Sequence, residues 1–113
     1  MIIQVVGIVA HPDKESELAG ALVTLKEETE SKPGCMSCLL YQDWSSPSVL
    51  YLESRWEKEE HLARYVASDT YKRLPGLKDL LLEEPTIEFL TVTEKKGLDF
   101  IEAVRLDQHY TGR

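Results

Sequence analysis

Residues 49–72 read VLYLESRWEKEEHLARYVASDTYK, and this run predicts a strand, a helix and the start of another helix. The apolar part, from Val49 to Trp56, is typical of a β-strand. The acidic residues that follow favour a helix start, because negative charge suits the positive end of the helix dipole. We expect that helix over residues 58–67. Ser68 or Asp69 would cap the next helix, whose apolar side carries Tyr71, Leu74, Leu77, Leu80 and Leu81.

The residues before this run predict a strand, a helix and a second strand. Residues 1–10 are almost continuously apolar, which indicates a strand covered on both faces, and Gln4 interrupts it near a strand end or projects into a pocket. Asp13 is a plausible N-cap for a helix that ends at Lys32-Pro33-Gly34. Its apolar residues recur at helical spacing: Leu18, Ala21, Leu22, Leu25 and Thr29.

The second strand is expected over residues 35–43, a turn over 44–47, and a hairpin partner over 49–56. A fourth strand follows over 86–93, and Pro75-Gly76 should split the helix before it. The order is β-α-β-β-α-β. It predicts an α+β, ferredoxin-like antiparallel sheet with helices on one face. The open face would be apolar, so we expect a homodimer with two sheets face to face.

Length and charge restrict the class of protein. The 113 residues fit one domain over residues 1–93, followed by a C-terminal extension over 94–113. Within it, residues 98–106 form an extended or helical element that packs on the partner subunit or covers a sheet edge, and the polar end contains His109. A net charge of −7 argues against nucleic acid as a partner. The apolar start lacks a basic region and is too short to span a membrane, so we expect a cytoplasmic protein with no membrane partner.

Cys35 and Cys38 form a Cys-x-x-Cys pair, which can indicate redox chemistry or a zinc site. Here the pair falls in a predicted strand. Residues three apart on a strand point to opposite faces, so the two thiols should not meet. No second Cys or His pair completes a metal site, and we expect buried structural thiols, no metal and no cofactor.

Several motifs resemble the antibiotic biosynthesis monooxygenase (ABM) domain family of dimeric α+β barrels. The resemblance covers about residues 2 to 93. The motifs are Pro12-Asp13-Lys14-Glu15, Pro33-Gly34-Cys35-Met36-Ser37, Tyr51 to Trp56-Glu57, the helix with Glu60 and Leu62, Ala67-Ser68-Asp69-Thr70-Tyr71, Leu77-Lys78-Asp79-Leu80-Leu81 and Glu84-Pro85. The family includes quinol and anthrone oxygenases, haem-degrading enzymes, an isomerase and members without known activity.

The chain departs from the family pattern at several positions. Family members often carry His where this chain has Tyr65 and Thr70, and Glu where it has Ser54. Haem-degrading relatives use Trp and His at the positions of Tyr65 and Pro75, which argues against haem degradation. The resemblance implies a cofactor-independent monooxygenase that acts on a quinol-like or polyphenolic small molecule.

Such chemistry needs an apolar pocket, a base and a hydrogen-bond donor for the oxyanion. His61 has the right ordinary pKa for a base, and Tyr65 lies one helical turn later as a donor. We take these two as catalytic candidates. Trp56 and Tyr71 are the substrate-binding candidates, as an aromatic wall.

Each candidate also has a purely structural interpretation. Trp56 can fill the core, His61 can be exposed, and the tyrosines can be core residues with hydroxyls at the rim. The alternative function is therefore a non-catalytic small-ligand-binding or regulatory dimer. A third possibility is isomerase chemistry on a small carbonyl metabolite, which needs a base and an acid facing each other.

Overall fold

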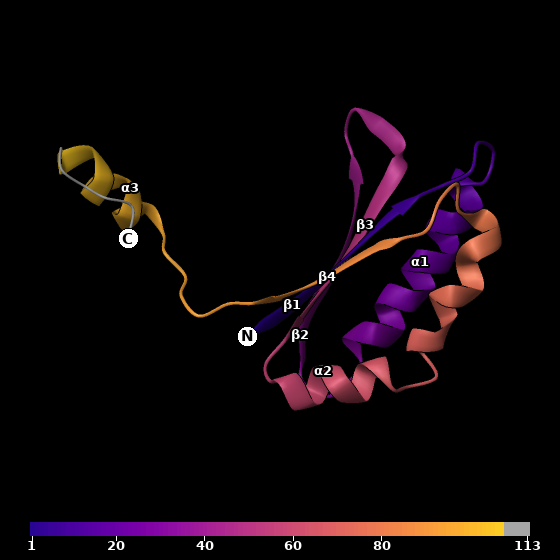
Figure 1. The fold of residues 1–113 in the computed structure, drawn as a ribbon, viewed down its shortest axis with the longest axis horizontal. Helices are drawn as coiled ribbons and strands as arrows, with labels where there is room; N and C mark the ends of the chain where they lie inside the picture. Colours follow the sequence, from indigo (N-terminus) through magenta and orange to yellow (C-terminus); the bar gives the residue numbers. More distant parts are fainter. Residues whose placement is uncertain (108–113) are drawn as a thin grey trace.

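The computed structural model describes residues 1–107, so His109 and the rest of the polar end lie outside the described residues. Figure 1 shows one twisted sheet with helices against one face. The elements in chain order are β1 Ile2–Val9, α1 Glu15–Glu30, β2 Cys35–Asp43, β3 Ser46–Trp56, α2 Glu59–Val66, the 3₁₀ helices η1 Tyr71–Arg73 and η2 Pro75–Leu80, β4 Thr86–Thr91 and α3 Leu98–Leu106.

The four strands are antiparallel and lie in the order β2-β3-β1-β4, which confirms the predicted ferredoxin-like sheet. The first strand of the chain is therefore central, and β4 is an edge strand. The β2–β3 hairpin turns on two residues only, because the Asp43 carboxylate accepts hydrogen bonds from the Ser45 amide and hydroxyl. As a result β3 begins at Ser46, three residues before the predicted start.

Two predictions about helix ends were wrong. Asp13 does not cap α1: it has a φ of 70°, Lys14 precedes the helix, and the helix begins at Glu15. The helix expected to be capped by Ser68 or Asp69 is not an α-helix either: its first 3₁₀ turn begins at Tyr71, with Thr70 in the cap position. Pro75 lacks an amide hydrogen, and the chain makes η1 and η2 instead, with Leu74 between them. The predicted split at Pro75-Gly76 is confirmed.

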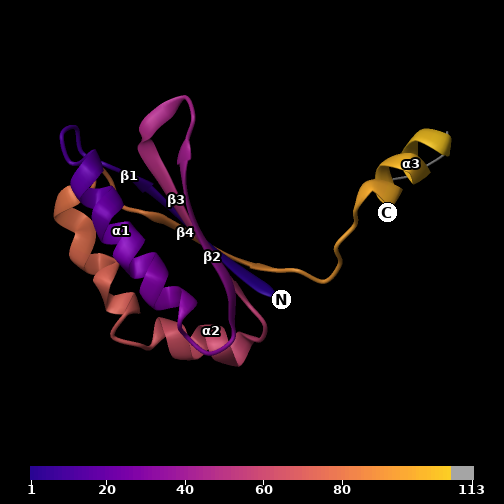
Figure 2. The same cartoon turned by 180° about the vertical axis from the view of Figure 1, so that it is seen from behind.

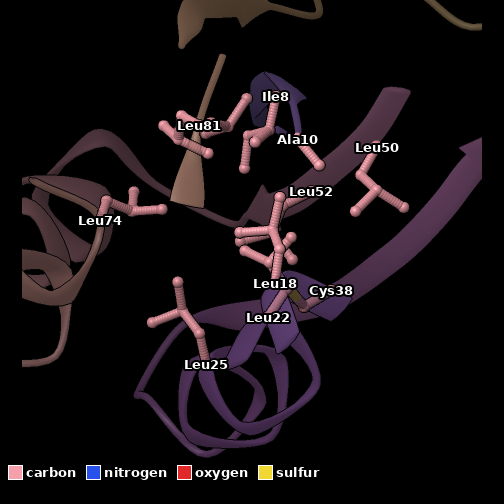
Figure 3. Close-up of a cluster of buried hydrophobic side chains, with 11 residues drawn as sticks. Ile8, Ala10, Leu18, Leu22, Leu25, Cys38, Leu50, Leu52, Leu74 and Leu81 are labelled. Atoms are coloured by element: carbon pink, nitrogen blue, oxygen red, sulfur yellow. The ribbon is translucent and has the colours of Figure 1, made fainter. Parts of the chain in front are cut away.

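The core lies between α1 and the inner face of the sheet (Figure 3). Alternate residues of β1 and β3 point inward, as the two-residue repeat of a strand requires. Leu18, Leu22 and Leu25 of α1 are fully buried against them. The ion pair between Glu28 and Arg73 joins α1 to η1 across the surface of this layer.

The outer face of the sheet has no helices over it in Figures 1 and 2. The register places Ile3 and Leu90 opposite each other on this face, and Tyr51 opposite Gly7 and Tyr41. The Tyr41 and Tyr51 rings stack with their centroids 5.3 Å apart. This face is therefore largely apolar and open in a single chain.

Residues after β4 leave the domain. The last backbone hydrogen bond between them and the sheet runs from the Val92 amide to the Met1 carbonyl. An extended arm then leads to α3, which stands apart from the sheet on the side away from α1 (Figures 1 and 2). Of the two predicted forms, extended or helical, residues 98–106 are helical. Within residues 1–107, no helix has the length and apolar character needed to cross a membrane.

Candidate functional site

A groove runs between α2 and the inner side of β4, because the helical layer does not extend over the edge strand. Its cavity measures about 450 Å³, which lies within the range of small-molecule sites. We call it the β4 groove. Its walls are Ile2, Leu62, Ala63, Val66, Ala67 and Phe89, with Glu59 and Thr91 as the polar residues. Phe89 is 52% exposed, so a large apolar ring is open to a ligand there.

A second cavity of about 380 Å³ lies further along β4. Tyr71 and Leu74 form one wall, and Ile87 belongs to β4. Ile87 and Phe89 are two residues apart on one strand and point to the same side, so the two cavities follow each other along β4. Tyr71 brings a phenol hydroxyl to a wall that is otherwise mainly apolar.

Behind these cavities, a chain of polar groups is buried in the domain. The Trp56 indole N–H donates to Ser54 Oγ over 2.9 Å, and the Ser54 hydroxyl donates to Gln4 Oε1 over 3.3 Å. The Gln4 amide then donates to the Tyr71 hydroxyl over 2.7 Å. These three hydrogen bonds link Trp56, Ser54, Gln4 and Tyr71, so the network holds Tyr71 in one position. Tyr71 also lines the second cavity, and its hydroxyl accepts from Gln4, so it can donate its own hydrogen to a ligand there.

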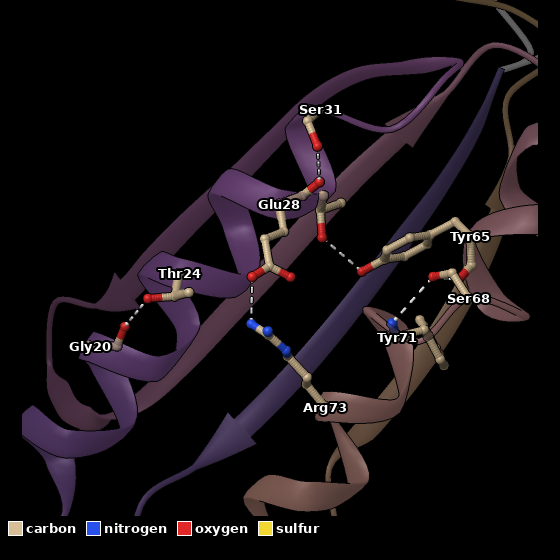
Figure 4. Close-up of polar contacts among 9 residues, drawn as sticks. Gly20, Thr24, Glu28, Ser31, Tyr65, Ser68, Tyr71 and Arg73 are labelled. Atoms are coloured by element: carbon tan, nitrogen blue, oxygen red, sulfur yellow. Dashed lines mark hydrogen bonds and ion pairs between the residues drawn. The ribbon is translucent and has the colours of Figure 1, made fainter.

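Three of the four predicted site residues meet. The Trp56 and Tyr65 rings stack at 4.7 Å, and Tyr71 meets Tyr65 edge to face at 5.2 Å. The Tyr65 hydroxyl shares a 3.0 Å hydrogen bond with Thr29 Oγ1 of α1 (Figure 4). Trp56 is fully buried and Tyr65 is 2% exposed, so both form the support behind Tyr71.

Burial keeps the tyrosines neutral. Desolvation raises the pKa of Tyr65 to about 12, although its hydrogen bond to Thr29 opposes the shift. Desolvation also raises the pKa of Tyr71, and the hydrogen bond from Gln4 opposes that shift. Near neutral pH these phenols can donate hydrogen bonds but do not act as bases.

The structure does not bring His61 to the groove. Its imidazole packs against Gly34: a Cβ built at Gly34 would lie 2.0 Å from His61 Cγ. Its Nδ1 atom is buried and has no hydrogen-bond partner among residues 1–107. The groove uses α2 residues 59, 62, 63 and 66, which share one helix face, and His61 lies on a different face.

The expectation that the two cysteines point to opposite faces was wrong. A bulge at Met36 shifts the register of β2, so that Cys35 lies opposite Trp56 and Cys38 opposite Ser54. Trp56 and Ser54 both face inward, and so do both thiols. Both cysteines are free. Burial raises the pKa of Cys38 to about 12, which leaves the thiol protonated. Among residues 1–107, no cluster of three or more His, Cys, Asp or Glu side chains could hold a metal.

Sequence reasoning missed Glu59, Phe89 and the polar role of Gln4. Glu59 belongs to an acidic run, so its pattern indicates only a solvated helix start. Phe89 alternates correctly for a strand, but the sequence does not show that a groove lies between α2 and β4. The importance of Gln4 is visible in the sequence, because it is a polar residue inside an apolar strand. In the structure it is 2% exposed.

A family model described as antibiotic biosynthesis monooxygenase matches residues 1–74. The matched span runs from β1 to the residues after η1. It includes the α2 wall of the β4 groove and Tyr71, and it excludes β4 and α3. A comparison with functionally curated proteins found no match.

Solved structures share the fold. A protein from Deinococcus radiodurans, described as a candidate antibiotic biosynthesis monooxygenase, is 20% identical with a TM-score of 0.79, over 86% of this chain and 97% of that one. Rv0793 from Mycobacterium tuberculosis is 21% identical with a TM-score of 0.77, over 85% and 98%. A conserved protein from Methanosarcina mazei Go1 is 29% identical with a TM-score of 0.73, over 80% and 91%.

Proposed function

Because this chain belongs to the antibiotic biosynthesis monooxygenase family, we propose that it is a cofactor-independent monooxygenase acting on a quinol-like or polyphenolic molecule. The observation that carries the proposal is the β4 groove, which is mainly apolar and open, and to which the described residues contribute one carboxylate, that of Glu59. Flat aromatic substrates fit such a site, since apolar walls bind the ring and few polar groups orient it.

The reaction needs an electron-rich substrate. Removal of a proton from the quinol makes an anion that can pass an electron to O₂, and recombination forms a carbon–oxygen bond. Loss of water then leaves a hydroxylated quinone. One oxygen atom enters the product and the other leaves as water. The two electrons and two hydrogens that form the water come from the substrate.

We assign the proton acceptor to Glu59 and the hydrogen-bond donor to Tyr71. Glu59 is the one ionisable side chain that lines the β4 groove within the described part of the chain. Tyr71 is held by Gln4 and keeps its hydroxyl hydrogen free for an oxyanion. Tyr65 and Trp56 support Tyr71 from behind. His61, which the sequence also suggested, does not line the β4 groove, and its substitution serves as the control.

Oxygen uptake tests the proposal. Menadiol and a panel of other quinols should give O₂ consumption above the uncatalysed rate, with a hydroxylated quinone as product by mass spectrometry. We expect Glu59→Gln and Tyr71→Phe to lower the rate by about 10- to 100-fold, and His61→Ala to leave it nearly unchanged. No uptake above background with any quinol would overturn the oxygenase proposal.

One observation favours a second candidate, a non-catalytic ligand-binding dimer. Among residues 1–107, no histidine lines the β4 groove, and the buried tyrosines stay protonated near neutral pH. This function predicts that quinones and quinols bind, seen by calorimetry, without oxygen uptake. Binding together with turnover would exclude it.

We also propose that the protein is a homodimer through the outer face of the sheet. Leu39, Tyr41 and Leu90 are each more than 40% exposed there, and so large an apolar face is uncommon on a monomer. Sedimentation at micromolar concentration should give twice the monomer mass. A Leu90→Asp variant, which places a charge on this face, should sediment as a monomer.

A further inference from the structure

We propose that α3 is an exchanged arm, which reaches across the sheet-to-sheet interface and packs on the second copy. The inference rests on the proposed dimer. Within one chain three apolar side chains of α3 are open to solvent: Leu98, Ile101 and Leu106 are 76%, 50% and 84% exposed. Leu98 and Ile101 are three residues apart and lie on one side of the helix. An isolated helix of nine residues is marginal in water, so α3 needs a surface to pack on.

The surface area of the chain agrees with an unpacked arm. The chain exposes 7962 Å², whereas a compact monomer of this size would expose about 6,300 Å². Its radius of gyration is 17.1 Å, compared with about 13 Å for a compact domain of this length. The excess area is about 1,700 Å², and each partner of a stable dimer buries about 800 Å². The uncovered surface is therefore enough for a dimer that includes the arm.

The position of α3 selects the second copy as its partner. The arm leaves β4 and turns toward the open side of the sheet, so that α3 and the outer face border the same empty space (Figures 1 and 2). A second sheet packed on the outer face would lie about 10 Å away. Residues 92–97 can span about 20 Å when extended. The arm is thus long enough to pass the second sheet and bring α3 against its copy.

Substitutions in α3 of the full chain test the arm. We expect the double variant Leu98→Asn and Ile101→Asn to raise the dimer dissociation constant at least tenfold, measured by sedimentation or fluorescence dilution. The matched control is Asp99→Asn with Glu102→Gln, which changes the polar side of the same helix and should leave the constant unchanged. Equal dissociation constants for the wild type and the Leu98/Ile101 variant would overturn the arm but not the dimer.

Cross-linking identifies the surface that α3 contacts. Benzoylphenylalanine is placed at Leu106, and ¹⁴N and ¹⁵N chains are refolded together and irradiated. Cross-linked peptides of mixed isotope composition would support exchange between copies. Cross-links within one isotope only would show that α3 folds back on its own domain and would overturn the proposal. A wild-type protein that is monomeric at micromolar concentration would overturn both the dimer and the arm.

Discussion

The Gln4 amide donates a 2.7 Å hydrogen bond to the Tyr71 hydroxyl and so joins the central strand of the sheet to η1, 67 residues later. Gln4 is almost fully buried, so its amide has no access to bulk water as a substitute partner. Tyr71→Phe should therefore lower the free energy of unfolding by about 1–3 kcal/mol, measured by urea denaturation.

The same pair permits a double-mutant cycle. Gln4→Met combined with Tyr71→Phe should cost less than the sum of the two single variants, because either change alone already breaks the hydrogen bond. Strictly additive losses would show that the two residues are not coupled.

Filling the β4 groove should block ligand binding without unfolding the protein. Ala63→Phe adds a ring inside the groove, and we expect the dissociation constant for menadione to rise at least tenfold in calorimetry. Arg64→Phe adds the same ring at the neighbouring, exposed position of α2 and is the matched control. Similar affinities in the two variants would place the ligand elsewhere.

Gly34 and Gly20 should respond oppositely to alanine. Gly34 has a φ of 81° and lies under the His61 ring, so Gly34→Ala meets both backbone strain and a clash. Its cost should be at least about 1–3 kcal/mol. Gly20 lies in α1 with nothing within 4 Å of an added Cβ, and Gly20→Ala should stabilise by about 0.5–1 kcal/mol. Thermal unfolding of both variants checks the difference in sign.

Alkaline pH should destabilise the fold through Tyr65. Its pKa is about 12 in the folded protein and about 10 in the unfolded chain. Between these values the unfolded chain has lost the proton and the folded chain has kept it, so the stabilising contribution falls as pH rises. The slope from this group is at most about 1.4 kcal/mol per pH unit. Denaturation curves at pH 9 to 11.5 should show a shallower decline for Tyr65→Phe than for the wild type.

Cys38 should be unreactive in the folded protein. With a pKa of about 12 it is almost entirely thiol at pH 8, and it is also buried. Iodoacetamide should label it only after unfolding in guanidinium, as followed by intact mass, while the less buried Cys35 reacts first. Rapid labelling of both residues in the native state would contradict this assignment.

The sequence was enough to predict the four strands and their order, because apolar runs and helical spacing are local patterns. Other features depend on relations between distant segments. The bulge at Met36 could not be predicted from the sequence. Cys35, Met36 and Cys38 can each lie on the inner or the outer face of the sheet, so their pattern does not fix the register of β2. The location of His61 depends on how α2 is rotated against Gly34. The β4 groove exists because the helical layer does not extend over the edge strand, which no residue of 86–91 reveals by itself.

The central position of β1 also determines when its two edges can be paired during synthesis. β1 is made before both of its partners, and it pairs with β3 on one side and with β4 on the other. Its second edge therefore stays without a partner until β4 has been made, as far as Thr91. An apolar strand with an open edge invites pairing with other chains. For this protein, the risk of mispairing is concentrated in the nascent chain, before β4 has been made.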